Sequence, residues 1–365
     1  MSFEEWDPSG IRAFLLSRRW VFTGGVWRGI HPKGPFAKPE FWQYIDENII
    51  PIAELNPHEL DIDLVVESRT LFRSLEVILP YLQRNSVRTL KISTADANST
   101  QLKPIVAFIS GFPNLQILEW NHFGHHYDIL PTFALLFPQT PLIQTFITNF
   151  NVTTLSAAGS AEMFAGALQS LPRLRQLYCS TNIAIWDHMQ LELPNLEVLV
   201  IDTMGDPIFE TQANLLTSFP KMTKLQCLCM SGVIPLVMGD LALHLPSQLA
   251  CLKIMLAGPE LPTTEATQTW LKELPRLTQL KELSLTSLMG ADWFPLLENP
   301  PQWANRLVLP CPVVASELER LQTLTQSVFD SAQSLNLQGG YTPDSGIVDF
   351  CSRFKSIRHL TYYGL

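Results

Sequence analysis

The chain has 365 residues and a mass of 41.2 kDa, enough for two ordinary domains or one long repeat protein. Charged residues make up 16% of it and apolar residues 46%, a balance that excludes a disordered chain. The 25 basic residues are outnumbered by 34 acidic ones, the net charge is -9, and no run of Lys or Arg could neutralise several phosphates. We therefore expect no nucleic-acid partner.

The first residues, Met1 to Pro8, are acidic and lack the basic and apolar regions of a secretory signal, and no later stretch offers about 20 uninterrupted apolar residues. These features predict a protein of the cytoplasm or nucleus that does not enter a membrane. The cysteines are scattered, which favours buried thiols over a disulfide framework. They are Cys179, Cys227, Cys229, Cys251, Cys311 and Cys351.

Residues 1–57 do not repeat. They contain two distinctive segments, Ile11–Trp20, which ends in Ser17-Arg-Arg-Trp20, and Pro39–Asn48, which begins Pro39-Glu-Phe-Trp42. Glycines and prolines between the two segments predict a loop.

From about residue 58 onward one pattern recurs, a proline followed by spaced apolar residues, as in Pro113-Asn-Leu-Gln-Ile-Leu118 and Pro172-Arg-Leu-Arg-Gln-Leu177. With the second apolar position of each copy as a marker, successive copies are 22 to 31 residues apart. Each copy predicts a strand. The markers are Ile62, Leu90, Leu118, Phe146, Leu177, Leu199, Leu228, Leu252, Leu283, Leu307, Leu335 and Leu360.

Between these strands, apolar residues recur at steps of three and four, which predicts helices. The predicted helix faces are Leu102, Ile105, Phe108, Ile109 and Phe112; Met163, Phe164, Leu168 and Leu171; Ala266, Trp270, Leu271 and Leu274; and Leu318, Leu321, Leu324 and Val328 behind a capping box at Ser316–Glu319.

A single strand and helix cannot bury their own apolar face, so neighbouring units must stack into one core. The spacing and the Leu-x-x-Leu-x-Leu pattern resemble leucine-rich repeats, although the turn asparagine of that consensus is mostly replaced. The predicted fold is α/β: a leucine-rich-repeat solenoid of about 12 irregular repeats over residues 58–365, with a parallel sheet on the concave face. Residues 1–57 are predicted to form a short helical N-terminal cap.

The N-terminal segments followed by these repeats resemble the fungal F-box-like proteins with C-terminal leucine-rich repeats. In that family an Arg-Arg-Trp ends one helix and is followed by a Pro-x-Leu-Trp turn and an Ile-Asp strand. Arg19, Trp20, Phe41 and Trp42 stand at matching positions. The resemblance implies that residues 1–57 are a degenerate F-box that binds the Skp adaptor of a cullin ubiquitin ligase through these four residues. The same tryptophans also fit a cap that closes the solenoid core.

Catalytic motifs are absent from the sequence: there is no phosphate-binding glycine loop, no paired Cys-x-x-Cys and no Gly-x-Ser-x-Gly. The densest group of possible metal ligands is His122, His125, His126 and Asp128, which we interpret as a polar loop because no second cluster accompanies it. Cys227 and Cys229 flank Leu228 and are interpreted as small surface residues of a strand. We expect no enzyme activity, no cofactor and no metal.

The neighbours of the marker leucines face the hollow of the solenoid if the leucines point into the core. The middle of this predicted surface is unusually apolar, which is typical of a binding site, although the chain itself could cover it, for instance with Asn299–Trp303. The candidate target-binding residues are Ile117, Glu119, Ile147, Gln176, Tyr178, Val198, Val200, Cys227, Cys229, Lys253, Met255 and Glu282.

The predicted function is non-catalytic protein recognition. In the first hypothesis, the repeats present a protein target to a ubiquitin ligase of the Skp and cullin type. In the alternative, the chain is a free-standing leucine-rich-repeat scaffold that does not bind the adaptor.

Overall fold

The structure is a computed structural model, and it forms two compact units, Met1–Cys179 and Ser180–Leu365, which we describe separately. The residues that it describes are 19–23, 26–27, 57–63, 85–94, 99–122, 129–150, 157–181, 183–203, 213–233, 237–256, 264–287, 306–308, 334–338, 352–353, 355 and 359–363.

The first unit alternates strands with helices, and its strands follow the order β7-β6-β5-β4-β3-β1-β2 in the sheet. The pairs β1/β3, β3/β4, β4/β5 and β5/β6 are parallel, whereas β1 and β2 form an antiparallel pair. The strands are β1 (Arg19–Thr23), β2 (Val26–Trp27), β3 (Glu59–Asp63), β4 (Thr89–Thr94), β5 (Ile117–His122), β6 (Thr145–Phe150) and β7 (Gln176–Thr181). The helices are α4 (Ser99–Ser110), α5 (Leu130–Leu136), η4 (Phe137–Gln139) and α6 (Ala157–Gln169).

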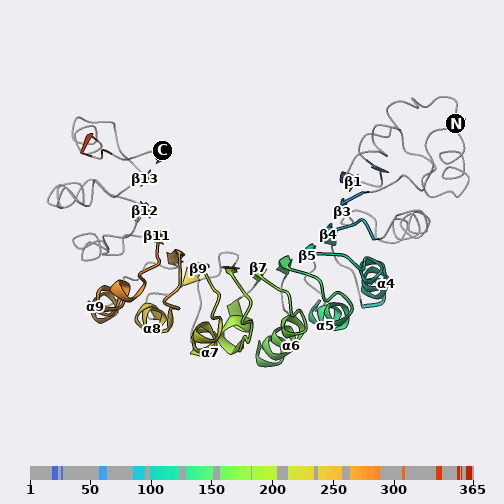
Figure 1. Cartoon of the computed structure of the whole chain (residues 1–365), viewed down its shortest axis with the longest axis horizontal. Helices are drawn as coiled ribbons and strands as arrows, with labels where there is room; N and C mark the ends of the chain where they lie inside the picture. Colours follow the sequence, from blue (N-terminus) through green and yellow to red (C-terminus); the bar gives the residue numbers. More distant parts are fainter. Residues whose placement is uncertain are drawn as a thin grey trace, which may run out of the picture. The chain divides into compact units, whose positions relative to one another are not determined.

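The second unit continues the alternation, with strands in the order β14 to β8 and parallel pairing between β8 and β9, β9 and β10, and β10 and β11. Within each unit the helices lie on one side of the strands (Figure 1). The strands are β8 (Val198–Asp202), β9 (Cys227–Val233), β10 (Cys251–Leu256), β11 (Glu282–Ser287), β12 (Arg306–Val308), β13 (Ser334–Gln338) and β14 (His359–Tyr363). The helices are η5 (Ile183–His188), α7 (Ala213–Ser218), η6 (Phe219–Lys221), α8 (Met238–His244), α9 (Thr264–Glu273) and η8 (Leu274–Arg276).

The predicted marker residues lie side by side in the sheet. Leu90 pairs with Leu118, and Leu118 with Phe146, while Leu228 pairs with both Leu199 and Leu252. All of these side chains are fully buried, as the period-two pattern of the strands requires. The prediction of Ile62 as the first marker is wrong. Leu60, two residues earlier, is the residue that pairs with Leu90.

The shape that recurs along the chain includes a turn before each strand. Proline stands at the start of η4, η6 and η8, where its missing N–H costs no hydrogen bond. The turn then closes through backbone bonds such as Leu225 N–H to Met222 O and Leu277 N–H to Leu274 O, both between 2.9 and 3.1 Å. At the start of the next strand, two backbone N–H groups donate to one carbonyl of the preceding repeat, as Gln116 and Ile117 do to Arg88 O. These shared backbone carbonyls fix where each strand begins.

The predicted helix faces form the core where the structure describes them. Leu102, Ile105, Phe108 and Ile109 of α4 are buried, as are Phe164 of α6 and Trp270 of α9. In the first unit an aromatic cluster surrounds Phe133 of α5, whose ring lies 5.3 to 6.0 Å from five others. These rings belong to Trp120, Phe137, Phe146, Phe150 and Phe164. The helix predicted over Leu318–Val328 lies outside the described residues.

The N-terminal segment differs from its expected form. Arg19 and Trp20 do not end a helix, because both lie in β1, which pairs in parallel with β3. The sheet therefore includes residues that were assigned to a helical cap, while Phe41 and Trp42 lie outside the described residues. The domain boundary at residue 58 stays a prediction.

Within the described part of the chain, no helix combines the length and apolar character needed to cross a membrane.

Candidate functional site

In each unit one side of the sheet faces away from the helices (Figure 1), and we call it the open face. It carries every candidate target-binding residue. Side chains on the strands alternate between buried and partly exposed, and the candidates occupy the partly exposed positions. Lys253 and Met255 are the most exposed of them, with 40% of Met255 accessible to solvent. The alternation predicted from the sequence is thus confirmed, whereas target binding by these residues stays a prediction.

On the open face of the first unit, one lysine lies between two glutamates. Lys91 Nζ is 3.7 Å from Glu59 Oε1 and 3.6 Å from Glu119 Oε2, because β3, β4 and β5 place these residues on adjacent strands. Ile117 and Ile147 are half-buried beside them. Partly exposed ion pairs of this kind add only about 0–1 kcal/mol to stability. Their main effect is on specificity, because a partner that binds here must carry charges that complement them. The sequence indicated Glu119 but not Glu59 or Lys91, because nothing in the sequence shows which strands are neighbours.

On the open face of the second unit, apolar side chains form one block. Strand register places Val198 of β8 beside Cys227 of β9, and Val200 beside Cys229. On the other side of β9, Cys251 of β10 lies beside Cys227. We call these five residues the valine–cysteine patch; all five are half-buried.

Polar groups border the valine–cysteine patch. Lys253 Nζ is 3.0 Å from Glu282 Oε1 at one edge. Burial lowers the pKa of Lys253, but its hydrogen bond to Glu282 and the charge of that carboxylate outweigh burial and raise it. At the ends of the strands, Ser231 donates a hydrogen bond to Asp202 Oδ1 and Ser180 donates to Asp202 Oδ2 at 3.4 Å. A partner that reaches this patch therefore meets an apolar centre with a charged and polar border.

Three thiols converge in the valine–cysteine patch. The Sγ atoms of Cys227, Cys229 and Cys251 all lie within 4.8 Å of one another, and those of Cys227 and Cys229 are 3.9 Å apart. The sequence indicated the first two as surface residues, but it did not show that Cys251, 22 positions further along, reaches them through the pairing of β9 with β10.

The three thiols are held in the protonated form. The hydrogen bond of Cys227 with Cys229, together with burial, raises the pKa of Cys227 to about 11. The bond with Cys227 lowers the pKa of Cys229, but contact with Cys251 and burial outweigh it and raise that pKa to about 11. The bond with Cys227 and burial raise the pKa of Cys251 to about 12. Because the thiolate is the nucleophile, these groups are poor nucleophiles at neutral pH.

The histidine group belongs partly to the core. His122 is the last residue of β5, its side chain is 2% exposed, and its Nδ1 lies 2.9 Å from Thr94 Oγ1. Thr94 Oγ1 also accepts a 3.1 Å hydrogen bond from the indole of Trp120. This buried network joins β4 to β5, and so His122 is a structural residue rather than part of an exposed polar loop. His125, His126 and Asp128 lie outside the described residues.

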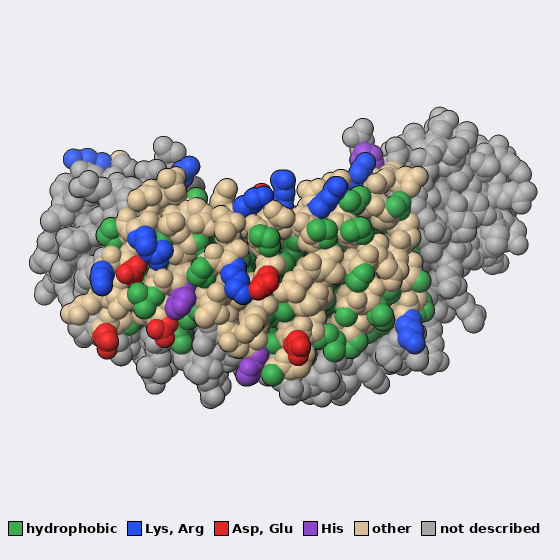
Figure 2. Space-filling model, turned by 60° about the horizontal axis from the view of Figure 1, so that its bottom comes forward, with side chains coloured by type: hydrophobic (Ala, Val, Ile, Leu, Met, Phe, Trp, Pro, Cys, Tyr) green, Lys and Arg blue, Asp and Glu red, His purple; other side chains and the backbone are tan. Residues whose placement is uncertain are grey.

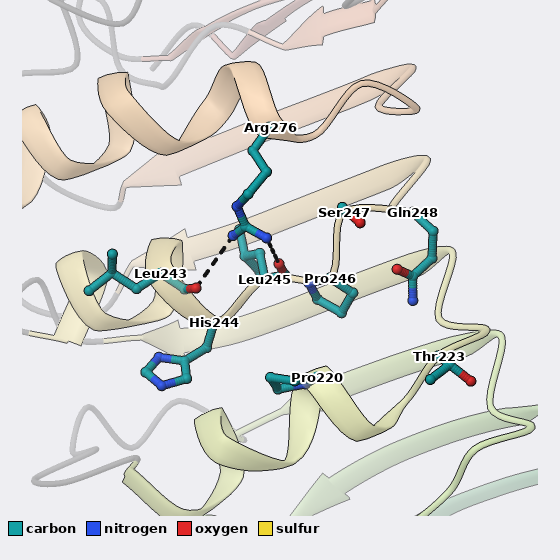
Figure 3. A pocket seen from close by; sticks show the side chains of 9 residues that line it. All are labelled: Pro220, Thr223, Leu243, His244, Leu245, Pro246, Ser247, Gln248 and Arg276. Carbon is teal, nitrogen blue, oxygen red and sulfur yellow. Dashed lines mark hydrogen bonds between the residues drawn. The ribbon is translucent and has the colours of Figure 1, made fainter.

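A shallow hollow of about 270 Å³ lies between α8 and the η6 turn of the second unit (Figure 3). Arg276 borders it, but its guanidinium is already engaged: it donates to Leu245 O at 2.8 Å, to Ala242 O at 3.2 Å and to Glu273 Oε2 at 3.0 Å. These bonds satisfy carbonyls at the C-terminal end of α8. Arg276 is therefore a capping residue supplied by the next repeat rather than a ligand-binding group.

Comparison with known proteins gives matches among solved structures only. No family model matches the chain, and no curated protein matches it. Among solved structures, it is similar to the crystal structure of the leucine-rich repeat-containing protein LegL7 from Legionella pneumophila. The TM-score is 0.40 and the identity 12%, over 95% of this chain and 90% of that one. The α/β repeat with its parallel sheet is established by the described elements themselves.

Proposed function

We propose that the chain is a non-catalytic protein-recognition module that binds a protein target on the open face of its second unit. The observation that carries this proposal is the valine–cysteine patch, in which Val198, Val200 and Cys229 stay partly exposed while their neighbours in the same strands are fully buried. Contiguous apolar surface with a polar border is typical of a protein interface.

The chemistry of the patch favours a target with an apolar anchor flanked by charge. Full burial of a valine-sized side chain is worth about 1.5–3 kcal/mol, and a half-buried one has part of that left to gain, so several must be covered together to offset the cost of association. The Lys253 and Glu282 pair at the edge would orient such an anchor rather than supply most of the affinity.

The helix-bearing side is a less suitable surface. Figure 2 shows acidic and basic side chains mixed over that side, with hydrophobic side chains scattered between them. Leu135 of α5 and Leu243 of α8 are its most exposed large hydrophobics, at 56% and 52%, and they belong to different units. Single exposed leucines are normal on any folded protein.

The test compares two charge substitutions of the full chain as bait. Val200→Glu places a carboxylate in the valine–cysteine patch, and Leu135→Glu places one on the helix-bearing side as a matched control. Proteins captured from a eukaryotic extract are quantified by mass spectrometry, and candidates are then produced and their affinity measured with purified components. We expect one target whose affinity falls about tenfold or more with Val200→Glu and is unchanged with Leu135→Glu. Equal affinity for all three baits would reject the proposal.

The ligase role is a finer proposal that rests on the N-terminal resemblance. In that case Arg19, Trp20, Phe41 and Trp42 bind the Skp adaptor, and the adaptor co-purifies with the chain unless Trp20 and Trp42 are replaced by Ala. The strand at β1 differs from the helix end of the F-box family and favours the alternative, a free-standing scaffold. The scaffold hypothesis expects target capture with no adaptor retained by the intact chain.

A further inference from the structure

The Sγ atoms of Cys227, Cys229 and Cys251 form a triangle on the open face of the second unit, and we propose that they bind one soft d10 metal ion, Cu(I) or Zn²⁺. This inference goes beyond target recognition, because it depends only on where the sulfur atoms lie.

The triangle has the size that a three-sulfur site requires. With metal–sulfur bonds of about 2.3 Å, sulfurs around one ion lie about 3.8–4.0 Å apart, the smaller value for tetrahedral and the larger for trigonal geometry. The Cys227 and Cys229 sulfurs are already 3.9 Å apart, and Cys251 Sγ lies within 4.8 Å of both. Small side-chain rotations are enough to close the site.

The sheet holds these ligands in place before any ion arrives. Cys227 and Cys229 flank the fully buried Leu228, so both side chains point to the same face of β9. Cys251 is the register partner of Cys227 on β10. Preorganised ligands on strands cost less ordering entropy than ligands on loops. All three residues are half-buried, which leaves an entry path from solvent.

The choice between the two ions depends on a fourth ligand. Cu(I) is satisfied by soft sulfur ligands alone, whereas Zn²⁺ in a protein takes four ligands. Glu282 Oε2 lies 3.6 Å from Cys251 Sγ, close to the ~3.5 Å separation of a sulfur and an oxygen on one tetrahedral zinc ion. The other oxygen of Glu282 pairs with Lys253 Nζ. Zinc would therefore take Glu282 Oε2 as its fourth ligand while Oε1 keeps its pair with Lys253, whereas Cu(I) would not need Glu282.

Binding must release protons, because metal ligation requires thiolates. Each of the three S–H bonds gives its proton to solvent as a metal–sulfur bond forms, and no electron is transferred. The affinity should consequently rise with pH.

The test uses the full chain, reduced and metal-free, titrated without oxygen with Cu(I) as its acetonitrile complex or, separately, with Zn²⁺. The measurements are the ultraviolet absorption of the metal–thiolate bond, the bound metal per chain, and the protons released. We expect one ion per chain, with an affinity that falls more than about 100-fold in Cys229→Ser and in Cys251→Ser. Cys179→Ser also removes one thiol but leaves the triangle intact, and should bind as the natural chain does. Circular dichroism confirms that each variant is folded.

Glu282→Gln separates the two ions. A zinc affinity that falls about tenfold or more in this variant supports the four-ligand site, and a Cu(I) affinity that does not change supports the three-sulfur site. Absence of stoichiometric binding of either ion, or equal affinity in the natural chain and Cys229→Ser, would overturn the proposal.

Discussion

The indole Nε1 of Trp270 donates a 2.8 Å hydrogen bond to the backbone carbonyl of Met238, and the bond joins α9 to the start of α8 in the preceding repeat. Trp270 is 1% exposed, so neither group can exchange the bond for one with water. The contact shows how the repeats stabilise one another: each helix supplies groups that its neighbour lacks.

Replacing Trp270 with Phe should lower stability more than the same change at Trp186. Both indoles are buried, but Trp186 Nε1 has no hydrogen-bond partner among the described residues, so Trp186→Phe removes no bond. Trp270→Phe removes this buried bond, and we expect it to cost about 0.5–1.5 kcal/mol more than the control. Urea unfolding of both variants measures the difference, and equal losses would contradict the role of the bond.

Phe133 should be the most sensitive single position of the first unit. Because five aromatic rings surround it, Phe133→Ala removes contacts with η4, α6, β5 and β6 together, and we expect a loss of about 3–5 kcal/mol. Leu135→Ala, two residues along the same helix and 56% exposed, should change stability by less than about 0.5 kcal/mol. Denaturant midpoints decide the matter, and similar midpoints for both variants would count against the described packing.

Two glycines should respond oppositely to alanine. Gly232 has a φ of 73°, and an added Cβ would overlap Thr203 Oγ1 and lie 3.0 Å from Thr203 Cβ, so Gly232→Ala should destabilise the second unit by more than about 1 kcal/mol. Gly166 lies in α6 with no atom within 4 Å of its would-be Cβ, and Gly166→Ala should add about 0.5–1 kcal/mol. Thermal unfolding gives both values. A stable Gly232→Ala would refute the left-handed backbone conformation at this position.

Stability should fall at alkaline pH, in part through Cys179. Burial raises the pKa of the Cys179 thiol well above its ordinary value of about 8.5. Above that pH the unfolded chain releases the thiol proton while the folded chain keeps it, so the free energy of unfolding decreases as pH rises, by up to about 1.4 kcal/mol per pH unit. Cys179→Ala should reduce the slope by that amount. Denaturant unfolding between pH 8 and 10 tests it, and an unchanged slope would argue that Cys179 is exposed.

The sequence predicted the repeat well because burial has a period that can be read directly. Leu118, Leu228 and Leu252 are each followed and preceded by side chains on the opposite face, and the hydrogen-bonded turns before the strands fix where each strand begins. Ile62 was misassigned because β3 has two adjacent apolar positions of the same parity, Leu60 and Ile62, and only pairing with β4 distinguishes them.

The chemistry of the open face was harder to predict, because it depends on which strands are neighbours. Cys251 joins Cys227 and Cys229, and Lys91 joins Glu59 and Glu119, across gaps of at least 22 residues. The sequence placed Cys227, Cys229 and Glu119 on the open face but could not place them next to their partners. At β1 the motif Arg19-Trp20 was assigned by resemblance to a helix, whereas pairing with β3 makes it a strand.

The most direct measurement of the recognition claim is site-specific photocrosslinking. A photoreactive amino acid replaces Val200 on the open face or Leu135 on the helix-bearing side, and the full chain is irradiated in a eukaryotic extract. Our account predicts a discrete crosslinked protein from position 200, displaced by excess natural chain, that is absent from position 135. Crosslinking of the same proteins from both positions, or displacement from neither, would contradict it.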